Sequence, residues 1–269
     1  MQDDLSLPDL QELVGLVRAV AREELLPRFA RVHATDKADG SLVSEADYAV
    51  QDRLAKQLGR QWPQFAFFGE ETPTADQQAS LADTGAGVWC LDPLDGTSNF
   101  VTGLPFFSIS LALLNQTGVA LGVVYDPVRD ECFSAIRSRG AWLNDRPLVC
   151  RASPISLTQA IAVVDFKRLS ANLAVKLVQH VPYRSQRNLG SVALEWCWLA
   201  ANRFHVYLHG GQKLWDLAAG SLILSEAGGV ATTLTGESVY RKQIDVRSVV
   251  AATDQELFQL WSSVLRTGD

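Results

Sequence analysis

The middle of the chain constrains the fold more than any other part of the sequence, because three apolar segments follow one another there at short intervals. "FFSISLALL", "VALGVVYDP" and "ECFSAI" lie between residues 106 and 136, and Gln116-Thr117-Gly118 separates the first segment from the second. Apolar segments with short turns between them predict an antiparallel meander of strands. We therefore expect a sheet in the central part of the chain.

Strand and helix patterns alternate in the second half. Helices that alternate with strands indicate an α/β layered arrangement. The expected strands cover residues 160–166, 204–209 and 248–253, and the expected helices cover residues 171–181, 191–201, 215–228 and 255–265. A division near residue 152 would separate an N-terminal α+β half, residues 1–152, from this C-terminal α/β half, residues 153–269.

Two amphipathic helices are expected before the sheet. The first lies within residues 5–31, with a start signal at Ser6 and Pro8 and apolar residues at helical spacing, and Pro27 should end or bend it. The second covers about residues 44–58 and follows a glycine-containing turn.

The net charge and the cysteine pattern exclude several classes of protein. The chain of 269 residues has a formal charge of −6 at pH 7, which argues against a general nucleic-acid binder because such proteins carry basic patches. Four widely spaced cysteines without a C-x-x-C pair indicate reduced, buried thiols. Neither a signal peptide nor a membrane-spanning stretch is evident. We expect a cytoplasmic protein with no nucleic-acid partner and no membrane partner.

Acidic residues gather at the ends of two short buried strands. Glu70 follows the apolar part of "FAFFGEE". Asp92 and Asp95 lie on either side of Pro93 in "WCLDPLDGTSNF", residues 89–100, and proline cannot continue a strand ladder. If the two strands are neighbours, three carboxylates meet at one edge of a sheet. Hard oxygen ligands without His or Cys suit Mg²⁺. The alternative is that Asp92 and Asp95 only shape a β-turn.

Motifs of other enzyme classes do not occur in the sequence. It has no EF-hand loop, G-x-S-x-G elbow, H-E-x-x-H pair, Walker loop or G-x-G-x-x-G fingerprint. Hydride transfer and serine-type acyl transfer therefore have no support.

Three segments resemble, in the same order, the signature blocks of the inositol monophosphatase family of Mg²⁺-dependent, lithium-sensitive phosphatases. They are "GEET" (69–72), "WCLDPLDGTSNF" (89–100) and "WDLAAGSLILSEAGG" (215–229), and "GVVYDPVRDECFSAIRSRGAWLND" between them is also typical. The resemblance implies a layered α-β-α-β-α sandwich of the inositol monophosphatase and sugar phosphatase type, within the α+β and α/β classes. It also implies a homodimer with two or three Mg²⁺ ions between the two halves of each chain.

Carried over position by position, the resemblance implies the ligands of two metal sites. Glu70, Asp92 and the backbone carbonyl of Leu94 would form the first site, and Asp92, Asp95 and Asp216 would form the second. Asp216 opens a helix in the far half of the chain, so the metals would tie the halves together. Taken alone, Glu70 could be a solvated strand end, and Asp216 could stabilise its helix N-terminus by about 0.3–1 kcal/mol.

The resemblance also implies a pair of residues that activates the attacking water. Thr97 follows the metal-binding turn, and the family pairs this threonine with the aspartate of a T-x-x-D segment. Here the segment is "SEAD", in which Ser44 replaces the threonine and Asp47 is retained. We hypothesise that Asp47 accepts a proton through Thr97 from a metal-activated water. The same S-x-x-D pattern is a capping box, and both roles can coexist.

Neighbouring residues complete the predicted site. The N–H groups of Gly96 and Thr97 would face a phosphate if a helical turn begins there. Lys37 resembles a family lysine near the metal site, with an exposed surface lysine as the alternative. Glu71, like Ser44, is expected to support the groups that touch metal or water.

Substrate choice is expected to come from the second half. In relatives, the turn "RNLGSVAL" (187–194), which here includes Ser191, and the segment before the W-D motif line the pocket. His209 stands seven residues before Asp216, where many inositol phosphatases carry a glutamate that binds ring hydroxyls. His209 and Lys213 either contact a hydroxyl or a second phosphate, or have no role in substrate binding.

The predicted activity is hydrolysis of a small-molecule phosphate ester, either inositol monophosphate or a related polyol phosphate. "DPLDGTSNF" is closer to the inositol-phosphatase form than to the "DGTKEF" form of 3'-phosphoadenosine 5'-phosphate phosphatases. A 3'(2'),5'-bisphosphate nucleotidase and a sugar or histidinol phosphate phosphatase with the same metal site are alternatives. A non-catalytic protein that has kept the fold is a third, and the intact acidic set argues against it because unpaired carboxylates cost stability.

Overall fold

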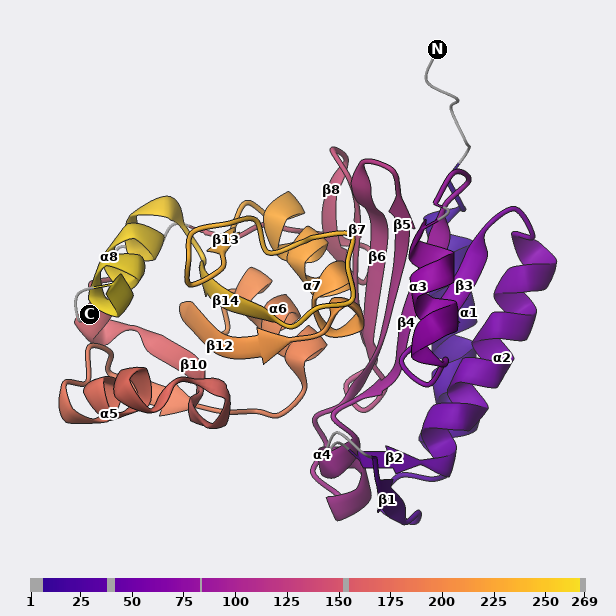
Figure 1. Ribbon diagram of the computed structural model, residues 1–269, viewed down its shortest axis with the longest axis horizontal. Helices are drawn as coiled ribbons and strands as arrows, with labels where there is room; N and C mark the ends of the chain where they lie inside the picture. The colour runs from indigo at the N-terminus through magenta and orange to yellow at the C-terminus, as the bar shows by residue number, and fades with distance from the viewer. Residues whose placement is uncertain (1–6, 38–41, 83, 152–154, 267–269) are drawn as a thin grey trace.

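A seven-stranded sheet forms the centre of the first half of the protein. The computed structural model describes residues 7–37, 42–82, 84–151 and 155–266 (Figure 1). The strand order is β3-β4-β5-β6-β7-β8-β9, with bounds Ala66–Gly69, Val88–Asp95, Ser108–Asn115, Gly118–Asp126, Glu131–Ile136, Gly140–Leu143 and Arg146–Leu148. The first pair is parallel and every following pair is antiparallel. The predicted meander between residues 106 and 136 is confirmed, and β8 and β9 extend it.

A five-stranded sheet forms the second half, in the order β11-β10-β12-β14-β13. The bounds of these strands are Ser185–Arg187, Ile161–Asp165, Val206–Gln212, Arg247–Ala252 and Val230–Thr232. β10 is parallel to both of its neighbours, so β10 and β12 end at the same edge of the sheet. A separate two-stranded sheet pairs β1 (Ala34–Asp36) with β2 (Leu42–Ser44).

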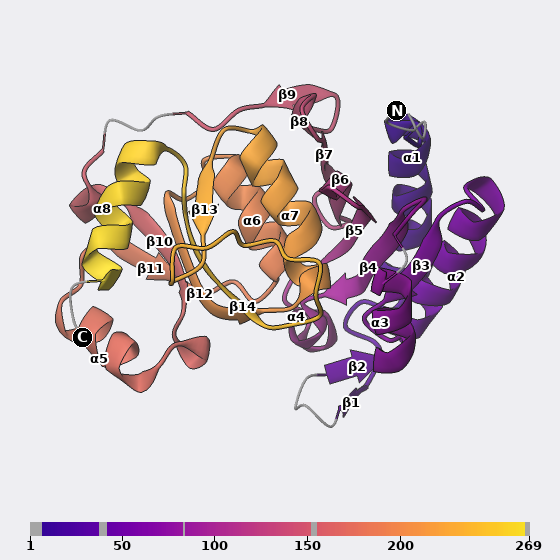
Figure 2. The same ribbon diagram turned by 45° about the horizontal axis from the view of Figure 1, so that its top comes forward.

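Three layers of helices alternate with the two sheets (Figures 1 and 2). Their bounds are Leu10–Val20 for α1, Glu45–Gln61 for α2, Ala171–Gln179 for α5, Val192–Ala200 for α6, Leu214–Glu226 for α7 and Gln255–Arg266 for α8. α1 and α2 cover the outer face of the seven-stranded sheet, α6 and α7 lie between the sheets, and α5 and α8 cover the five-stranded sheet. This α-β-α-β-α order confirms the predicted sandwich. Two further helices, α3 (Thr74–Ala82) and α4 (Thr97–Thr102), lie in connections.

The central helix α7 is apolar on nearly every side because it is buried between the sheets. Two glycines permit its close packing. A Cβ atom on Gly122 of β6 would lie 2.9 Å from Ala219 Cα, and one on Gly220 would lie 2.5 Å from Trp196 Cβ of α6. Since α7 carries Asp216 in its first turn, this packing also fixes the position of that carboxylate.

The structure differs from the sequence prediction mainly at the first helix. α1 begins at Leu10, because the side chain of Asp9 caps it by accepting hydrogen bonds from two N–H groups of the first turn at 2.9 and 3.0 Å. The helical segment ends before Pro27, as expected, and its last turn is π-helical. Ser6 and most of the glycine-containing turn, residues 38–41, lie outside the described residues.

Two other predictions can be compared with the structure. The four cysteines are free thiols; Cys90, Cys132 and Cys197 are buried and Cys150 is partly exposed. Within the described ranges, no helix is long and apolar enough to cross a membrane. The division predicted near residue 152 falls on residues 152–154, outside the described part of the chain, and stays a prediction.

Candidate active site

The ends of β3 and β4 bring three carboxylates to one edge of the seven-stranded sheet. The two strands are parallel neighbours, and Glu70 N donates a hydrogen bond to Leu91 O at 2.9 Å, immediately before Asp92. The pairing of β4 with β5 becomes irregular between Asp92 and Asp95, where Pro93 interrupts the ladder. The condition set by the sequence, that the two strands be neighbours, is therefore met.

The first turn of α7 brings a fourth carboxylate from the other half of the chain. Asp92 pairs in register with Ser110 of β5, and Ser110 Oγ donates to Trp215 O at 3.1 Å. Asp216 follows directly. Its Oδ2 accepts from Lys213 N at 2.8 Å, so Asp216 also caps its own helix, as the alternative interpretation expected.

Burial and mutual repulsion raise the pKa values of three of these carboxylates. Asp92 is 2% exposed, and desolvation, followed by the charges of Glu70, Asp95 and Asp216, raises its pKa well above the usual value. Desolvation raises the pKa of Asp216 to about 8. It raises the pKa of Asp95 to about 6, although hydrogen bonds to Asp95 act in the opposite direction. A divalent cation would relieve this repulsion, so the clustered hard oxygens fit Mg²⁺.

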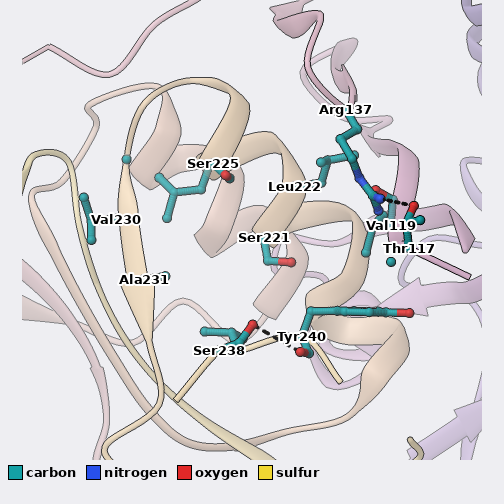
Figure 3. A pocket seen from close by; sticks show the side chains of 14 residues that line it. Thr117, Val119, Arg137, Ser221, Leu222, Ser225, Val230, Ala231, Ser238 and Tyr240 are labelled. Carbon is teal, nitrogen blue, oxygen red and sulfur yellow. Dashed lines mark hydrogen bonds between the residues drawn. The ribbon is translucent and has the colours of Figure 1, made fainter. Parts of the chain in front are cut away.

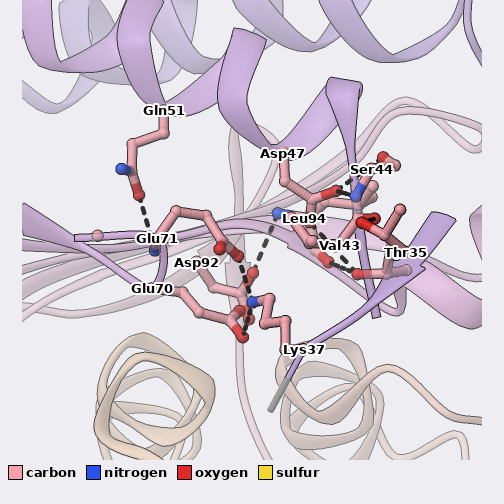
Figure 4. Close-up of polar contacts among 12 residues, drawn as sticks. Thr35, Lys37, Val43, Ser44, Asp47, Gln51, Glu70, Glu71, Asp92 and Leu94 are labelled. Atoms are coloured by element: carbon pink, nitrogen blue, oxygen red, sulfur yellow. Dashed lines mark hydrogen bonds and ion pairs between the residues drawn. The ribbon is translucent and has the colours of Figure 1, made fainter. Parts of the chain in front are cut away.

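The ammonium group of Lys37 lies against two acidic side chains (Figure 4). Lys37 Nζ is 2.8 Å from Glu70 Oε1 and also forms an ion pair with Glu71, whose N–H donates to Gln51 Oε1 at 3.1 Å. Partial burial disfavours the charged amine, but the two carboxylates outweigh it and raise the pKa of Lys37. Lys37 is therefore a cation beside the predicted metal ligands, and the alternative of an exposed surface lysine is wrong.

Asp95 binds the N-terminus of α6 as well as facing the other carboxylates. Its Oδ2 accepts from Ser191 Oγ at 2.6 Å and Ala193 N at 2.7 Å, and its Oδ1 accepts from Val192 N at 3.0 Å. Ser191 is fully buried, and its hydroxyl donates to Asp95. Its predicted contact with substrate stays a prediction. The described residues contain no group of three His, Cys, Asp or Glu side chains already arranged as a metal centre.

Asp47 lies between a helix cap and the hydroxyl of Thr97. Ser44 N and Ser44 Oγ each donate to Asp47 Oδ2 at 2.7 Å, which confirms the capping box. Thr97 Oγ1 lies 3.3 Å from Asp47 Oδ1 and 3.1 Å from Leu94 O, so its one proton can go to either acceptor. Desolvation raises the pKa of Asp47 to about 6, which suits a group that exchanges a proton near neutral pH.

Gly96 forms a tight corner between β4 and α4. It stands at the N-cap of α4 with a φ of 96°, in the left-handed region that favours glycine. A Cβ atom there would lie 3.1 Å from Phe106 O and 3.3 Å from Gly190 O. The helical turn that the sequence analysis required for phosphate binding therefore begins at Thr97.

His209 and Lys213 lie on the connection from β12 to α7. His209 is buried, its Nε2 is 3.2 Å from Asp165 Oδ2, and its Nδ1 accepts from Gly211 N at 3.1 Å. The ammonium group of Lys213 lies over the Trp215 ring, 5.3 Å from the centroid. The role of both residues in substrate binding stays a prediction.

Two acidic residues near the site were missed by the sequence analysis. Asp165 ends β10 just as Glu70 follows β3, so its place at a strand end was an available signal. Glu195 gave no such signal, because it lies within an apolar helical pattern. Glu195 Oε1 accepts from Leu189 N at 2.9 Å and Gly190 N at 3.1 Å, and this holds the turn beside Gly96.

A cavity of about 460 Å³ lies elsewhere, between α7, the β5–β6 turn and the segment around Tyr240 (Figure 3). Its lining includes the guanidinium group of Arg137 and several hydroxyls, but no carboxylate and none of the predicted site residues. It therefore offers no ligands for Mg²⁺.

The chain is similar to known proteins over nearly its whole length. The sequence profile described as the Inositol monophosphatase family matches residues 9–267. Inositol monophosphatase 1 of Solanum lycopersicum is 34% identical over 245 residues, which cover 88% of this chain and 87% of that protein. The extragenic suppressor protein suhB of Bartonella henselae superimposes with a TM-score of 0.82 at 27% identity, over 97% of this chain and 99% of that one. The staphylococcal IMPase-II with bound 2'-AMP superimposes with a TM-score of 0.79 at 26% identity, over 94% and 92% of the two chains.

Proposed function

The chain belongs to the inositol monophosphatase family, and on this premise we propose that it is a Mg²⁺-dependent phosphomonoesterase that hydrolyses inositol monophosphate or a related polyol phosphate. The family consists of phosphatases, and this chain is one of them. The observation that carries the proposal is the convergence of four carboxylates, from both halves of the chain, beside the Asp47–Thr97 pair.

The groups assigned to hold two or three Mg²⁺ ions are the four carboxylates and one backbone carbonyl: Glu70, Asp92, Asp95, Asp216 and Leu94 O. When bound, Mg²⁺ supplies charge neutralisation at the phosphoryl oxygens and makes water easier to deprotonate. Leu94 N donates to Asp92 Oδ1 at 3.0 Å, and this hydrogen bond orients the Asp92 carboxylate.

Asp47 and Thr97 are assigned the proton transfer. In this mechanism Thr97 Oγ1 accepts a proton from the attacking water while it donates its own to Asp47 Oδ1, 3.3 Å away. The two Ser44 donors hold Oδ2 of the same carboxylate, so Oδ1 faces Thr97. General-base assistance of this kind contributes typically about 10²–10⁴-fold to rate.

The corner at Gly96 is assigned to the phosphate. The N–H groups of Gly96 and Thr97 stand at the start of α4, where N–H groups favour anions. The glycine lets this corner pack closely against Phe106 O and Gly190 O. Lys37 adds a positive charge beside Glu70 and Glu71. These groups bind the phosphoryl group of any ester, so substrate choice must depend on contacts with the alcohol.

A second candidate substrate class has one specific observation in its favour. The staphylococcal IMPase-II structure holds 2'-AMP, a nucleotide with a phosphate on its ribose. A 3'(2'),5'-bisphosphate nucleotidase, or a sugar or histidinol phosphate phosphatase, would use the same metal ligands. Lithium inhibition, a homodimer and a cytoplasmic location are further parts of the proposal, and they rest on the sequence resemblance and composition.

Phosphate release from a panel of esters tests the proposal. The purified protein is assayed with myo-inositol 1-phosphate, adenosine 3',5'-bisphosphate, histidinol phosphate and fructose 1,6-bisphosphate, in Mg²⁺, in EDTA, and in Mg²⁺ with Li⁺. We expect Mg²⁺-dependent turnover that is fastest with the inositol ester and is inhibited by Li⁺, from a protein that elutes as a dimer. Absence of turnover with every ester, in a protein that binds Mg²⁺, would refute it.

A further inference from the structure

Asp165 and His209 form a pair at the ends of two parallel strands. They are register partners of β10 and β12, and His209 Nε2 lies 3.2 Å from Asp165 Oδ2. His209 Nδ1 accepts from Gly211 N at 3.1 Å, so the proton of the neutral ring is on Nε2 and is donated to Asp165. Both ring nitrogens are thus engaged within the protein. His209 has no donor left for a ligand, and its contact orients the carboxylate of Asp165.

The carboxylate of Asp165 retains capacity for one more hydrogen bond. Its Oδ1 accepts from Lys167 N at 3.0 Å and lies 3.5 Å from Asn188 Nδ2, and its side chain is 16% exposed. A carboxylate can accept about four hydrogen bonds, and three protein donors are present here. Partial burial acts to raise the pKa of Asp165, but the contact with His209 and the other donors outweigh it and lower the pKa. Asp165 is therefore an oriented, ionised acceptor.

Residues 188–190 connect Asp165 to Gly96, the residue assigned to phosphate binding. Asn188, which contacts Asp165, is followed by Leu189, whose carbonyl accepts from Asn99 Nδ2 of α4 at 2.8 Å. Gly190 O then lies 3.3 Å from the place where a Cβ atom on Gly96 would be. Residues 188–190 therefore link the carboxylate of Asp165 to the start of α4.

The other member of the pair is connected to the predicted metal ligands. After His209, β12 leads within four residues to Lys213, whose N–H donates to Asp216. Two separate routes thus connect the pair with residues of the predicted site, and ligands of such sheets bind outside the carboxyl ends of parallel strands.

We propose that Asp165, held by His209, accepts a hydrogen bond from a hydroxyl of the leaving alcohol and makes the enzyme selective for polyol phosphates. This inference rests on the proposed phosphatase function and assigns its substrate class. A carboxylate at this place favours a vicinal hydroxyl and repels a second phosphate. Three exposed basic residues near Asp165 and Asn188 in the sequence would bind a second phosphate: Lys167, Arg168 and Arg187. Preference for a bisphosphate substrate is therefore the competing outcome of the test.

The test compares three esters in Mg²⁺. Values of kcat/KM are measured for myo-inositol 1-phosphate, for phenyl phosphate, whose leaving group has no further hydroxyl, and for adenosine 3',5'-bisphosphate. We expect Asp165→Asn to lower the ratio of inositol to phenyl ester by at least about tenfold, mainly through KM, because a hydrogen bond to a charged group is lost. Asp165→Ser keeps an acceptor for Lys167 N and guards against a folding defect. Asp145→Asn, at an exposed turn far from the site, should leave the ratio unchanged.

His209 is tested as a positioning residue. His209→Leu removes the donor to Asp165 and should lower the same ratio, whereas His209→Gln keeps an N–H donor and should restore most of it. A merely structural role would lower turnover of both esters together.

Each result separates the inference from the proposed function. If none of the three esters releases phosphate, the proposed function and the inference are both refuted. Only the inference is refuted if phenyl phosphate is hydrolysed but both Asp165 variants keep the wild-type ratio of kcat/KM for the inositol ester to that for the phenyl ester. The same conclusion follows if the wild type prefers the bisphosphate.

Discussion

Ser191 Oγ donates a hydrogen bond to Asp95 Oδ2 at 2.6 Å, and this contact joins the N-terminus of α6 to the end of β4 across 96 residues of sequence. Asp95 is assigned to a metal and is also the acceptor for α6. The same carboxylate therefore helps to hold the two halves of the protein together.

Ser191→Ala should lower stability. The substitution removes one of four donors to a buried carboxylate, and we expect the free energy of unfolding to fall by about 1.5–3 kcal/mol. Urea denaturation in EDTA measures it. The exposed Ser263, replaced by Ala, is the control and should change the free energy by less than about 0.5 kcal/mol. Equal effects of the two substitutions would mean that the contact with Asp95 contributes nothing.

Asp47→Asn should lower kcat by about 10²–10⁴-fold, because the amide cannot accept the proton passed on by Thr97. Asn can still accept from Ser44 N, so the helix cap is retained. Steady-state kinetics with Mg²⁺ across a pH series checks this. Asp52→Asn, an exposed change on the same helix, should leave kcat unchanged. If the Asp47 variant keeps the wild-type kcat and pH profile, Asp47 has only the capping role.

Stability without Mg²⁺ should fall as pH rises from about 4 to about 7. Burial raises the pKa of Asp47 from 3.8 to about 6, so in this range the folded state binds more protons than the unfolded state. The free energy of unfolding then decreases with pH, by up to about 3 kcal/mol for Asp47 alone. Asp95 acts in the same direction, and Asp216, with a pKa of about 8, extends the loss to higher pH.

Urea denaturation at pH 4 and pH 7 in EDTA checks the sign. The Asp47→Asn variant should show a weaker decrease than the wild type. A stability that rises over this interval in both proteins would contradict the pKa shift assigned to Asp47.

Asp216→Asn should weaken the response to Mg²⁺. The amide still accepts from Lys213 N, so α7 keeps its cap, but one anionic ligand is lost. We expect the Mg²⁺ concentration for half-maximal activity to rise at least about tenfold. Asp76→Asn changes an exposed aspartate in the first turn of α3 and should leave that concentration as it is. An unchanged Mg²⁺ response in the Asp216 variant would leave this carboxylate with helix capping alone.

Gly96→Ala should be destabilising, by about 1–2 kcal/mol, because alanine is strained in the left-handed region. Its Cβ atom would also lie 3.1 Å from Phe106 O, so we expect reduced kcat as well. Gly59→Ala is the matched control, since Gly59 lies inside α2 with open space around it. That change should stabilise the protein by about 0.5–1 kcal/mol. Thermal unfolding compares the two variants, and similar melting temperatures would argue against the constraint at Gly96.

Local sequence patterns predicted the elements that are long and regular. The helices α2 and α8 show apolar residues at helical spacing, because each buries one face. The strands between residues 106 and 136 and the helices α6 and α7 are instead long apolar segments, because nearly all of their surface is buried. β11 and β13 were missed, since three residues are too few to show a period. The start of α1 was misjudged because Asp9 is also a capping residue, and only contacts show which cap is used.

What the sequence determined by itself was the chemistry: acidic residues at strand and helix ends, a Ser-x-x-Asp cap, and signature blocks that identify a family of phosphatases. Only the tertiary structure decided which groups meet. Lys37 with Glu70, Asp95 with Ser191, and Asp165 with His209 are contacts between residues 33, 96 and 44 positions apart (70 − 37, 191 − 95, 209 − 165). Periodicity reports only on neighbours along one helix or strand, whereas these partners are set by how sheets and helices pack.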